Sequence, residues 1–278
     1  MAIGYAGITP TADLMSFYRS FSDIPFTAEI SHAVKAEGLA KATFGDSFKD
    51  SLFLAAMAEA RYKRIDIHVR DYTNILEVAV GRSPRALILT ARPQISYVAT
   101  DLPGAIEQYQ ALVVDLAHGH GLTRDNIKFA AVNALGAEEL QRAVRLLPEA
   151  GPVAVISEGF MVYLNRSEKL TFLNNVRRVL DERGGVLITS DVMVGTRSLN
   201  KPNPLGLLAR MVNRDMSDVG FRDDDEASGF FEGAGFSARA FFEPVEVKSI
   251  TTLHLENDPN SQIAMKLPVW VLASRTNA

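Results

Sequence analysis

A tight turn after the apolar run Ile75–Val80 has the residues of a ligand-binding loop. Gly81 lets the backbone approach a ligand closely, and Pro84 is a favourable first residue for a helix. A dinucleotide fingerprint needs three glycines here, but Ala79 and Pro84 occupy two of the three positions. The turn is therefore a poor cradle for a pyrophosphate. A strand–helix turn that binds no ligand is the alternative.

Asp101 closes the next apolar run, 24 positions after Glu77. A carboxylate about 20 positions beyond the turn, at the end of the second strand, can accept hydrogen bonds from both ribose hydroxyls. Asp101 can equally serve as the N-cap of a helix that opens at Pro103. After the third run, the amide of Asn133 can bind an adenine edge, because it has both a donor and an acceptor. A turn-forming asparagine is the alternative.

Glu158 ends the fourth run, among apolar neighbours, where a carboxylate needs a cationic partner. The sulfonium or ammonium group of a ligand would be one such partner, and a salt bridge to Arg61 or Arg85 is the alternative. Arg61 lies early on the helix that leads into the first strand. It is therefore better placed than His68, near the other end, to bind a ligand carboxylate.

Other candidates for chemistry are weaker. His254 and His32 are the histidines that we place near the ligand side, as candidate general bases. Aromatic and apolar side chains of the N-terminal region and of residues 195–265 could line a substrate pocket, although ordinary packing explains them equally well. The substrate candidates are Tyr18, Phe21, Tyr163 and Met211. We expect no metal site, because no ligand spacing is visible.

The elements that must position these residues alternate along the chain. Residues 11–70 are predicted to be helical, and helices are expected at about 84–91, 103–118, 137–147 and 167–181. Strands are predicted at Ile75–Val80, Ser96–Thr100, Ile127–Val132, Val153–Ile156, Val186–Thr189, Ala238–Phe242 and Val269–Ala273. Alternating strands and helices indicate a parallel sheet, and the last two strands lack a crossover helix. We predict a Rossmann-like, seven-stranded, mostly parallel α/β sheet that ends in an antiparallel hairpin.

We expect a single domain over 1–278, divided into four parts. A helical N-terminal cap spans 1–70, a donor-binding core 71–192, an insertion or lid 193–223 with a short helix near Leu205–Val212, and C-terminal strands 224–278. The 278 residues are 47% hydrophobic, which suffices for a large core.

Charge and composition exclude several classes of function. The formal net charge is −4, so nucleic acid and anionic membranes are disfavoured as partners. The chain has no cysteine, which excludes disulfides, thiolate metal sites and a cysteine nucleophile. No export signal or apolar run of membrane-spanning length is visible, so we expect a cytoplasmic protein.

Taken together, these segments resemble the bacterial branch of the leucine carboxyl methyltransferase family, whose members methylate oxygen in natural-product biosynthesis. The resemblance spans about residues 8–275 and is loose in 195–265. It is carried by Ile8–Ala12, Arg61–Asp66, Glu77–Arg85, Tyr97–Pro103, Glu158–Leu164 and Gly233–Phe236.

The resemblance implies S-adenosylmethionine as methyl donor, bound at the turn, and a small-molecule acceptor. It implies that Arg61 binds the donor carboxylate and Asp101 the ribose, with Asn133 beside adenine. Two departures stand out: Ala79 replaces a glycine and Asn133 an aspartate. The donor-site residues expected on this basis are Arg61, Glu77, Ala79, Gly81, Asp101, Leu102, Asn133, Ala134 and Glu158.

The expected activity is therefore O-methylation of a small, partly apolar metabolite, with a carboxylate or a phenol as acceptor. A methyltransferase-like protein that only binds small molecules is one alternative. A nicotinamide-dependent oxidoreductase is another, disfavoured by the incomplete glycine fingerprint and the terminal hairpin. The oligomeric state is not predicted.

Overall fold

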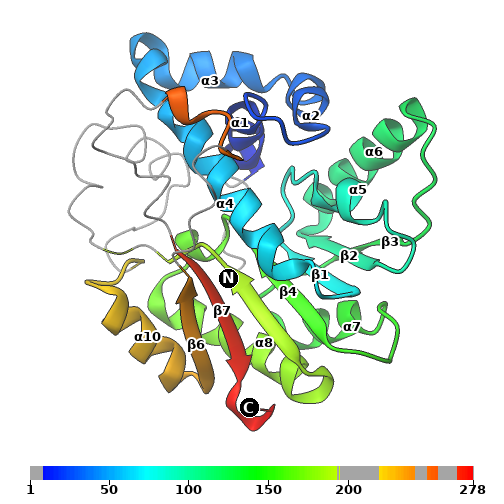
Figure 1. Cartoon of the computed structure of the whole chain (residues 1–278), viewed down its shortest axis with the longest axis vertical. Helices are drawn as coiled ribbons and strands as arrows, with labels where there is room; N and C mark the ends of the chain where they lie inside the picture. The colour runs from blue at the N-terminus through cyan, green and yellow to red at the C-terminus, as the bar shows by residue number, and fades with distance from the viewer. Residues whose placement is uncertain (1–8, 193, 195–218, 242–248, 256–267, 278) are drawn as a thin grey trace.

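In the computed structural model, a seven-stranded sheet forms the centre of the chain (Figure 1). The structure describes residues 9–192, 194, 219–241, 249–255 and 268–277. The strand order is β3-β2-β1-β4-β5-β7-β6. The strands are β1 (Asn74–Val78), β2 (Ser96–Asp101), β3 (Ile127–Ala131), β4 (Val153–Ser157), β5 (Gly185–Thr189), β6 (Phe236–Phe241) and β7 (Val269–Ser274).

The sheet confirms the predicted fold class. Strands β1 to β5 pair in parallel, whereas β7 runs antiparallel to both β5 and β6. The apolar side chains of β1 and β4 are buried along the whole strand, as expected for parallel strands covered on both faces. The sequence prediction extended β1 to Val80, but the strand ends at Val78 because Ala79 adopts a left-handed conformation with φ of 53°.

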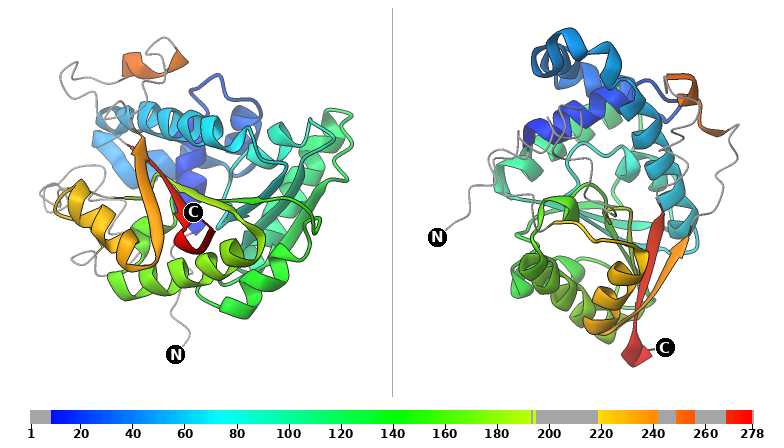
Figure 2. Two further views of the ribbon diagram at one scale, coloured as in Figure 1. Left: turned by 60° about the horizontal axis from the view of Figure 1, so that its bottom comes forward. Right: turned by 90° about the vertical axis from the view of Figure 1, so that its left-hand side faces the viewer.

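Helices cover both faces of the sheet, as the two views of Figure 2 show. One hydrophobic core joins α4, α5 and α6 to the sheet, and a second joins α7, α8 and α10 to its other face. These helices are α4 (Phe53–Val69), α5 (Arg85–Leu89), α6 (Pro103–Gly119), α7 (Ala137–Val144), α8 (Arg166–Arg183) and α10 (Asp224–Gly233). With both faces covered, the place where a ligand is expected in such a sheet is the row of carboxyl ends of the parallel strands, here called the ligand edge.

A helical cap packs above that edge, as predicted. It consists of α1 (Thr9–Arg19), α2 (Thr27–Ala33), α3 (Ala36–Phe44) and the first half of α4. Its core contains Phe17, Tyr18 and Phe44. Tyr18 is fully buried and donates a hydrogen bond to Ser51 Oγ at 2.7 Å. Packing within the cap accounts for Tyr18 in this structure, and its role in substrate binding stays a prediction.

A buried carboxylate attaches a late segment of the chain to α4. Glu59 has no exposed surface and accepts hydrogen bonds from the amides of Thr251 and Thr252, at 2.9 and 2.8 Å. Lys63, one turn later, binds Glu59 Oε1 at 2.6 Å and the carbonyl oxygen of Ser249 at 2.6 Å. This attachment fixes residues 249–252 on α4.

Candidate functional site

Polar side chains gather where β3, β2, β1 and β4 end side by side. Asp101 is the last residue of β2, and the turn Ala79–Pro84 follows β1. Glu158 follows β4, and Asn133 lies two residues after β3. Each of these residues therefore lies at the strand end at which it was predicted, and the strand order brings those ends together.

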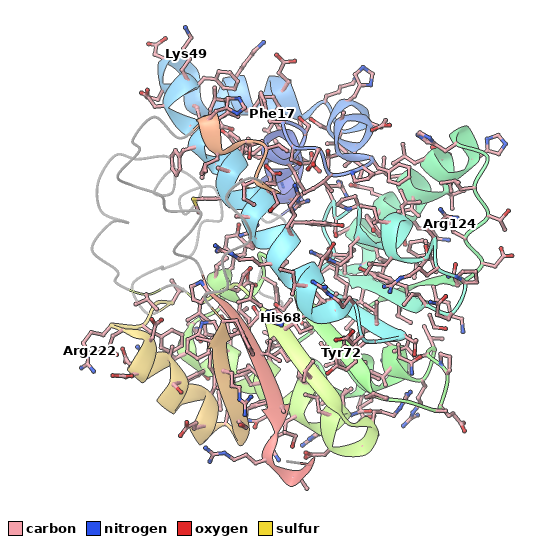
Figure 3. The ribbon with its side chains drawn as sticks, in the orientation of Figure 1. Phe17, Lys49, His68, Tyr72, Arg124 and Arg222 are labelled. Atoms are coloured by element: carbon pink, nitrogen blue, oxygen red, sulfur yellow. The ribbon has the colours of Figure 1, made fainter. Side chains whose placement is uncertain are left out.

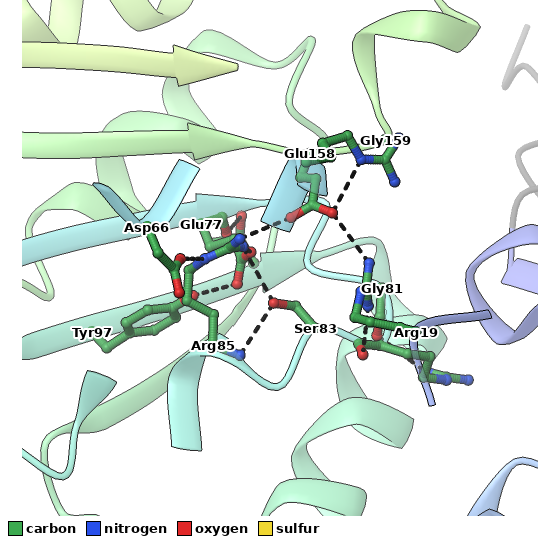
Figure 4. Close-up of polar contacts among 12 residues, drawn as sticks. Arg19, Asp66, Glu77, Gly81, Ser83, Arg85, Tyr97, Glu158 and Gly159 are labelled. Atoms are coloured by element: carbon green, nitrogen blue, oxygen red, sulfur yellow. Dashed lines mark hydrogen bonds and ion pairs between the residues drawn. The ribbon is translucent and has the colours of Figure 1, made fainter. Parts of the chain in front are cut away.

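Glu158 accepts from three guanidinium groups, as Figure 4 shows in part. Its Oε1 lies 3.2 Å from Arg19 Nη2 and 3.2 Å from Arg61 Nε, and its Oε2 lies 2.9 Å from Arg85 Nη2. The salt bridges to Arg61 and Arg85 were predicted as the alternative to a ligand cation. Arg19 was not foreseen, because it reaches Glu158 from α1, 139 positions earlier in the chain.

Arg85 is the centre of this cluster. It is fully buried and also binds two other carboxylates, Glu77 Oε1 and, at 2.6 Å, Asp66 Oδ1. Glu77 accepts a second short hydrogen bond, from the hydroxyl of Tyr97. The expected donor-site residue Glu77 is thus engaged by protein groups on both oxygens, and its evident role is to hold Arg85.

Burial and pairing move the carboxyl groups of this cluster in opposite directions. Burial opposes ionisation of Glu158, but the adjacent Arg19, Arg85 and Arg61 outweigh it and lower its pKa to about 2. For Asp66 and Glu77, burial dominates and raises the pKa, although both bind Arg85. We attribute the difference to the number of guanidinium groups: three surround Glu158, whereas among the described residues Arg85 alone forms an ion pair with Asp66 and Glu77.

The low pKa of Glu158 predicts an acid-dependent loss of stability. A carboxyl group whose folded-state pKa lies below its unfolded value stabilises the fold above the unfolded pKa and loses this effect as pH falls toward the folded one. With values of 4.5 and about 2, the Glu158 contribution should fall by about 2 kcal/mol between pH 5 and pH 3. Urea unfolding of the wild type and Glu158→Gln at both pH values measures it. Equal pH slopes for the two proteins would contradict the assignment.

The turn after β1 is held by Asp101. Its Oδ2 accepts from the amide of Gly81 at 2.9 Å, and its Oδ1 accepts from the amide of Leu102 at 2.8 Å. The N-cap residue of α6 is Leu102, so Asp101 is not the N-cap that the alternative interpretation required. Each carboxylate oxygen keeps a further lone pair for a ligand hydroxyl. Ala79 takes the left-handed conformation usual for glycine, at a cost of roughly 1 kcal/mol, so this departure leaves the turn possible.

Asn133 forms a local turn, which was the alternative interpretation of this residue. Its Oδ1 accepts from the amide of Leu135 at 3.1 Å, and its own amide donates to Glu139 Oε2 at 2.6 Å. The neighbouring Ala134 is buried, with its carbonyl oxygen bound by Asn175 of α8 at 3.1 Å.

Asp191, after β5, orients the loop that carries Glu158. Its carboxylate accepts from the consecutive amides of Gly159, Phe160 and Met161 at 2.6, 2.8 and 3.0 Å. Burial raises its pKa, and these amides and Arg61 oppose that rise. Asp191 was not among the predicted site residues, although it is an acid just beyond the apolar run Val186–Thr189.

Among the remaining candidates, Tyr163 lies beside the cluster, whereas His254, His32 and Phe21 are exposed. His254 is exposed and lies on the segment that is bound to Glu59. Glu59 comes two positions before Arg61 on α4, so the two side chains leave the helix on nearly opposite sides. His32 is exposed on α2, and Phe21 is 42% exposed. Tyr163 donates to Thr11 Oγ1 at 3.2 Å, close to the site. Met211 and the helix predicted near Leu205–Val212 lie outside the described residues.

His68 lies far along α4 from Arg61, as expected. Its ring packs 4.6 Å from that of Phe241 in β6, beside Tyr72 (Figure 3). Among the described residues, no helix is long and apolar enough to cross a membrane.

Comparison with known proteins identifies the fold. The sequence matches no protein-family model, and no curated protein is found to be similar to it. Among solved structures, a DUF574 family protein from Streptomyces avermitilis is 14% identical, with a TM-score of 0.55, and 95% of this chain aligns with 96% of that protein. The methyltransferase domain of bacterial CtHen1 is 12% identical, with a TM-score of 0.51 and coverages of 78% and 99%.

PigF, solved with S-adenosylhomocysteine, is 19% identical, with a TM-score of 0.50, and 82% of this chain aligns with 58% of PigF. The chain likewise covers only 57% of the pyocyanin biosynthetic protein PhzM. At these identities the likeness concerns the fold alone. With the strand order, it defines this chain as a protein of the Rossmann-like class I methyltransferase fold.

Proposed function

We propose that this protein is an S-adenosylmethionine-dependent O-methyltransferase that acts on a small, partly apolar metabolite. The observation that carries the proposal is that Arg61 and Asp101 both lie at the carboxyl ends of the strands in this fold. The two terminal nitrogens of Arg61 make no hydrogen bond with the described residues, although its Nε is fixed on Glu158. A guanidinium held this way offers a ligand carboxylate two parallel donors.

The residues present fit the donor in chemical type. Arg61 would bind the methionine carboxylate of the donor, and the free lone pairs of Asp101 would accept hydrogen bonds from the ribose hydroxyls. The turn at Gly81 would lie against the donor molecule between these two groups. When bound, S-adenosylmethionine supplies a methyl group activated by a sulfonium. The task of the chain is to hold donor and acceptor in line and to exclude water.

The position of α1 supports exclusion of water from the turn. A Cβ atom added to Gly81 would lie 3.1 Å from that of Ala12, so α1 packs directly over the turn. Arg82 of the turn binds Asp13 of the same helix at 2.7 Å. His32 and His254 are both exposed, and neither is bonded to the cluster among the described residues, so we infer that catalysis rests on positioning. An acceptor that is ionised at neutral pH, such as a carboxylate, needs no general base.

Replacing Arg61 by lysine tests the role of the guanidinium. The change keeps the positive charge but removes the two parallel N–H donors of the planar guanidinium, so affinity for S-adenosylhomocysteine should fall about tenfold. Affinity for methylthioadenosine, which lacks the carboxylate, should stay within about twofold. Calorimetry with both ligands measures this, and Arg70→Lys, on an exposed arginine at the end of α4, is the control. An equal loss of affinity for both ligands would show that Arg61 does not bind the ligand carboxylate.

On the basis of the family resemblance, we further propose that the protein belongs to the natural-product branch of the leucine carboxyl methyltransferases. Methyl transfer to oxygen, detected by mass spectrometry and NMR of the product, separates this proposal from a protein that binds the donor without turnover.

A further inference from the structure

The carboxylate of Glu158 is shared by arginines from three helices, α1, α4 and α5. Arg19 of α1 and Arg61 of α4 each lie 3.2 Å from the same oxygen, Oε1, and Arg85 of α5 lies 2.9 Å from the other. Figure 4 shows Arg19 and Arg85 reaching different oxygens of this carboxylate. The Glu158 side chain is 4% exposed, so protein groups engage both of its oxygens and leave it little surface for a ligand.

This sharing leaves Arg61 with a single contact to Glu158. Arginine and a carboxylate commonly pair through two parallel hydrogen bonds. Among the described residues, however, Arg61 donates to Glu158 from Nε alone, and Arg85 occupies the second oxygen that a two-bond pair would need. The terminal nitrogen Nη2 of Arg61 lies beside Gly159, where an added Cβ atom would approach it to 3.8 Å. The terminal nitrogens of Arg61 are thereby kept for a ligand.

Arg19 connects two loops of the ligand edge. Besides binding Glu158 after β4, it donates from Nη1 to the carbonyl oxygen of Arg82, in the turn after β1, at 3.3 Å. The Arg19 side chain is buried, and its Nε has no hydrogen-bond partner among the described residues. A buried donor left unpaired opposes folding, so the position of Arg19 is not one that stability alone would select.

We propose that Arg19 is a positioning residue for the donor site: it occupies Glu158 Oε1 and so limits Arg61 to one hydrogen bond there. This inference rests on the proposed function, in which Arg61 binds the donor carboxylate. Without Arg19, Oε1 has room for a second donor, and Arg61 supplies it from a terminal nitrogen, which is then lost to the ligand. Because Arg19 belongs to α1, the seating of this cap helix sets how well the site accepts a ligand carboxylate.

The test compares two ligands that differ only in the carboxylate. S-adenosylhomocysteine and its decarboxylated analogue are titrated calorimetrically into each protein, and the ratio of their dissociation constants gives the carboxylate preference. Arg19→Met should lower this preference by about fivefold or more, while affinity for the analogue stays within about twofold of the wild type. Arg19→Gln, which keeps a polar end without the charge, takes its place if Arg19→Met does not fold, and the same loss is expected.

Lysine substitutions separate a contact with Glu158 from a contact with the ligand. A lysine can still place a charged donor on one oxygen, so Arg19→Lys should keep the preference within about threefold of the wild type. Arg61→Lys, which loses the parallel donors, should lower it about tenfold. An equally large loss in Arg19→Lys would show that the Arg19 guanidinium meets the ligand itself, and would overturn the inference.

Two further variants test whether Arg19 acts through Glu158. In a Glu158→Gln background, Arg19→Met should change the preference by less than about twofold. Asp13→Asn weakens the ion pair of α1 with Arg82 and leaves Glu158 untouched, so it should not change the preference.

An unchanged preference in the neutral Arg19 variants, or an equal loss of affinity for both ligands, overturns the role of Arg19. If the wild type binds neither ligand, or Arg61→Lys keeps the full preference, the proposed donor site itself fails.

Discussion

Replacing Arg85 by methionine should lower the free energy of unfolding by about 3–5 kcal/mol. The guanidinium of Arg85 is fully buried and binds Asp66, Glu77 and Glu158. Methionine keeps much of the volume but leaves these carboxylates without their shared cation. Removing one charged partner from a buried ion cluster is far more destabilising than replacing the whole cluster by apolar groups.

The pH dependence of this deficit distinguishes lost charge from lost packing. Without Arg85, the already raised pKa values of Asp66 and Glu77 should rise further. A raised carboxyl pKa favours the folded state when the group is protonated, and this advantage is lost as pH rises through the folded pKa. The deficit of Arg85→Met should therefore be smaller at pH 5 than at pH 8.

Urea unfolding at both pH values gives these free energies, and Arg92→Met is the matched control. Within the described part of the chain, the Arg92 side chain makes a single hydrogen bond, at the surface, to the carbonyl oxygen of Arg70. Its replacement should therefore change stability by less than about 0.5 kcal/mol. A deficit for Arg85→Met below about 1 kcal/mol, or one independent of pH, would contradict the central role of Arg85.

Periodicity predicted the sheet because each strand is short, apolar and bounded by turns. The strands that begin at Ser96, Ile127 and Val153 start at the predicted residue, and the antiparallel pair followed from a missing crossover helix. The end of β1 was missed because it depends on the φ angle of Ala79, which an alanine in an apolar run does not reveal.

The sequence predicted those site residues whose positions follow directly from where a strand ends. Chain order places Asp101 and Glu158 at the same edge, and helix direction places Arg61 above them. Arg19 and Asp191 were missed because their contacts depend on how α1 and the loop after β5 fold back over the edge. Aromatic residues of the cap were ambiguous, since a buried core and a substrate pocket use the same side chains.

Loss of the Asp101 carboxylate should have the largest effect on ligand binding. Asp101→Ala removes the acceptor for both ribose hydroxyls, each a charge-assisted hydrogen bond of about 1.5–3 kcal/mol before compensation. It also frees the amides of Gly81 and Leu102, which loosens the turn. We expect affinity for S-adenosylhomocysteine to fall by at least about tenfold, and by up to about ten-thousandfold if both bonds form fully.

Asp101→Asn separates these two contributions. Asparagine keeps one oxygen for a backbone amide but loses the charge, so its affinity should fall between those of the wild type and Asp101→Ala. Circular dichroism and thermal unfolding verify that each variant is folded.

The central claim, that this edge of the sheet binds an S-adenosyl donor, is tested most directly by calorimetric titration of S-adenosylhomocysteine into the wild type and Asp101→Ala. We predict binding at a single site per chain in the wild type, and a dissociation constant at least about tenfold higher in the folded variant. Absence of binding to the wild type, or the same dissociation constant in both proteins, would contradict the account.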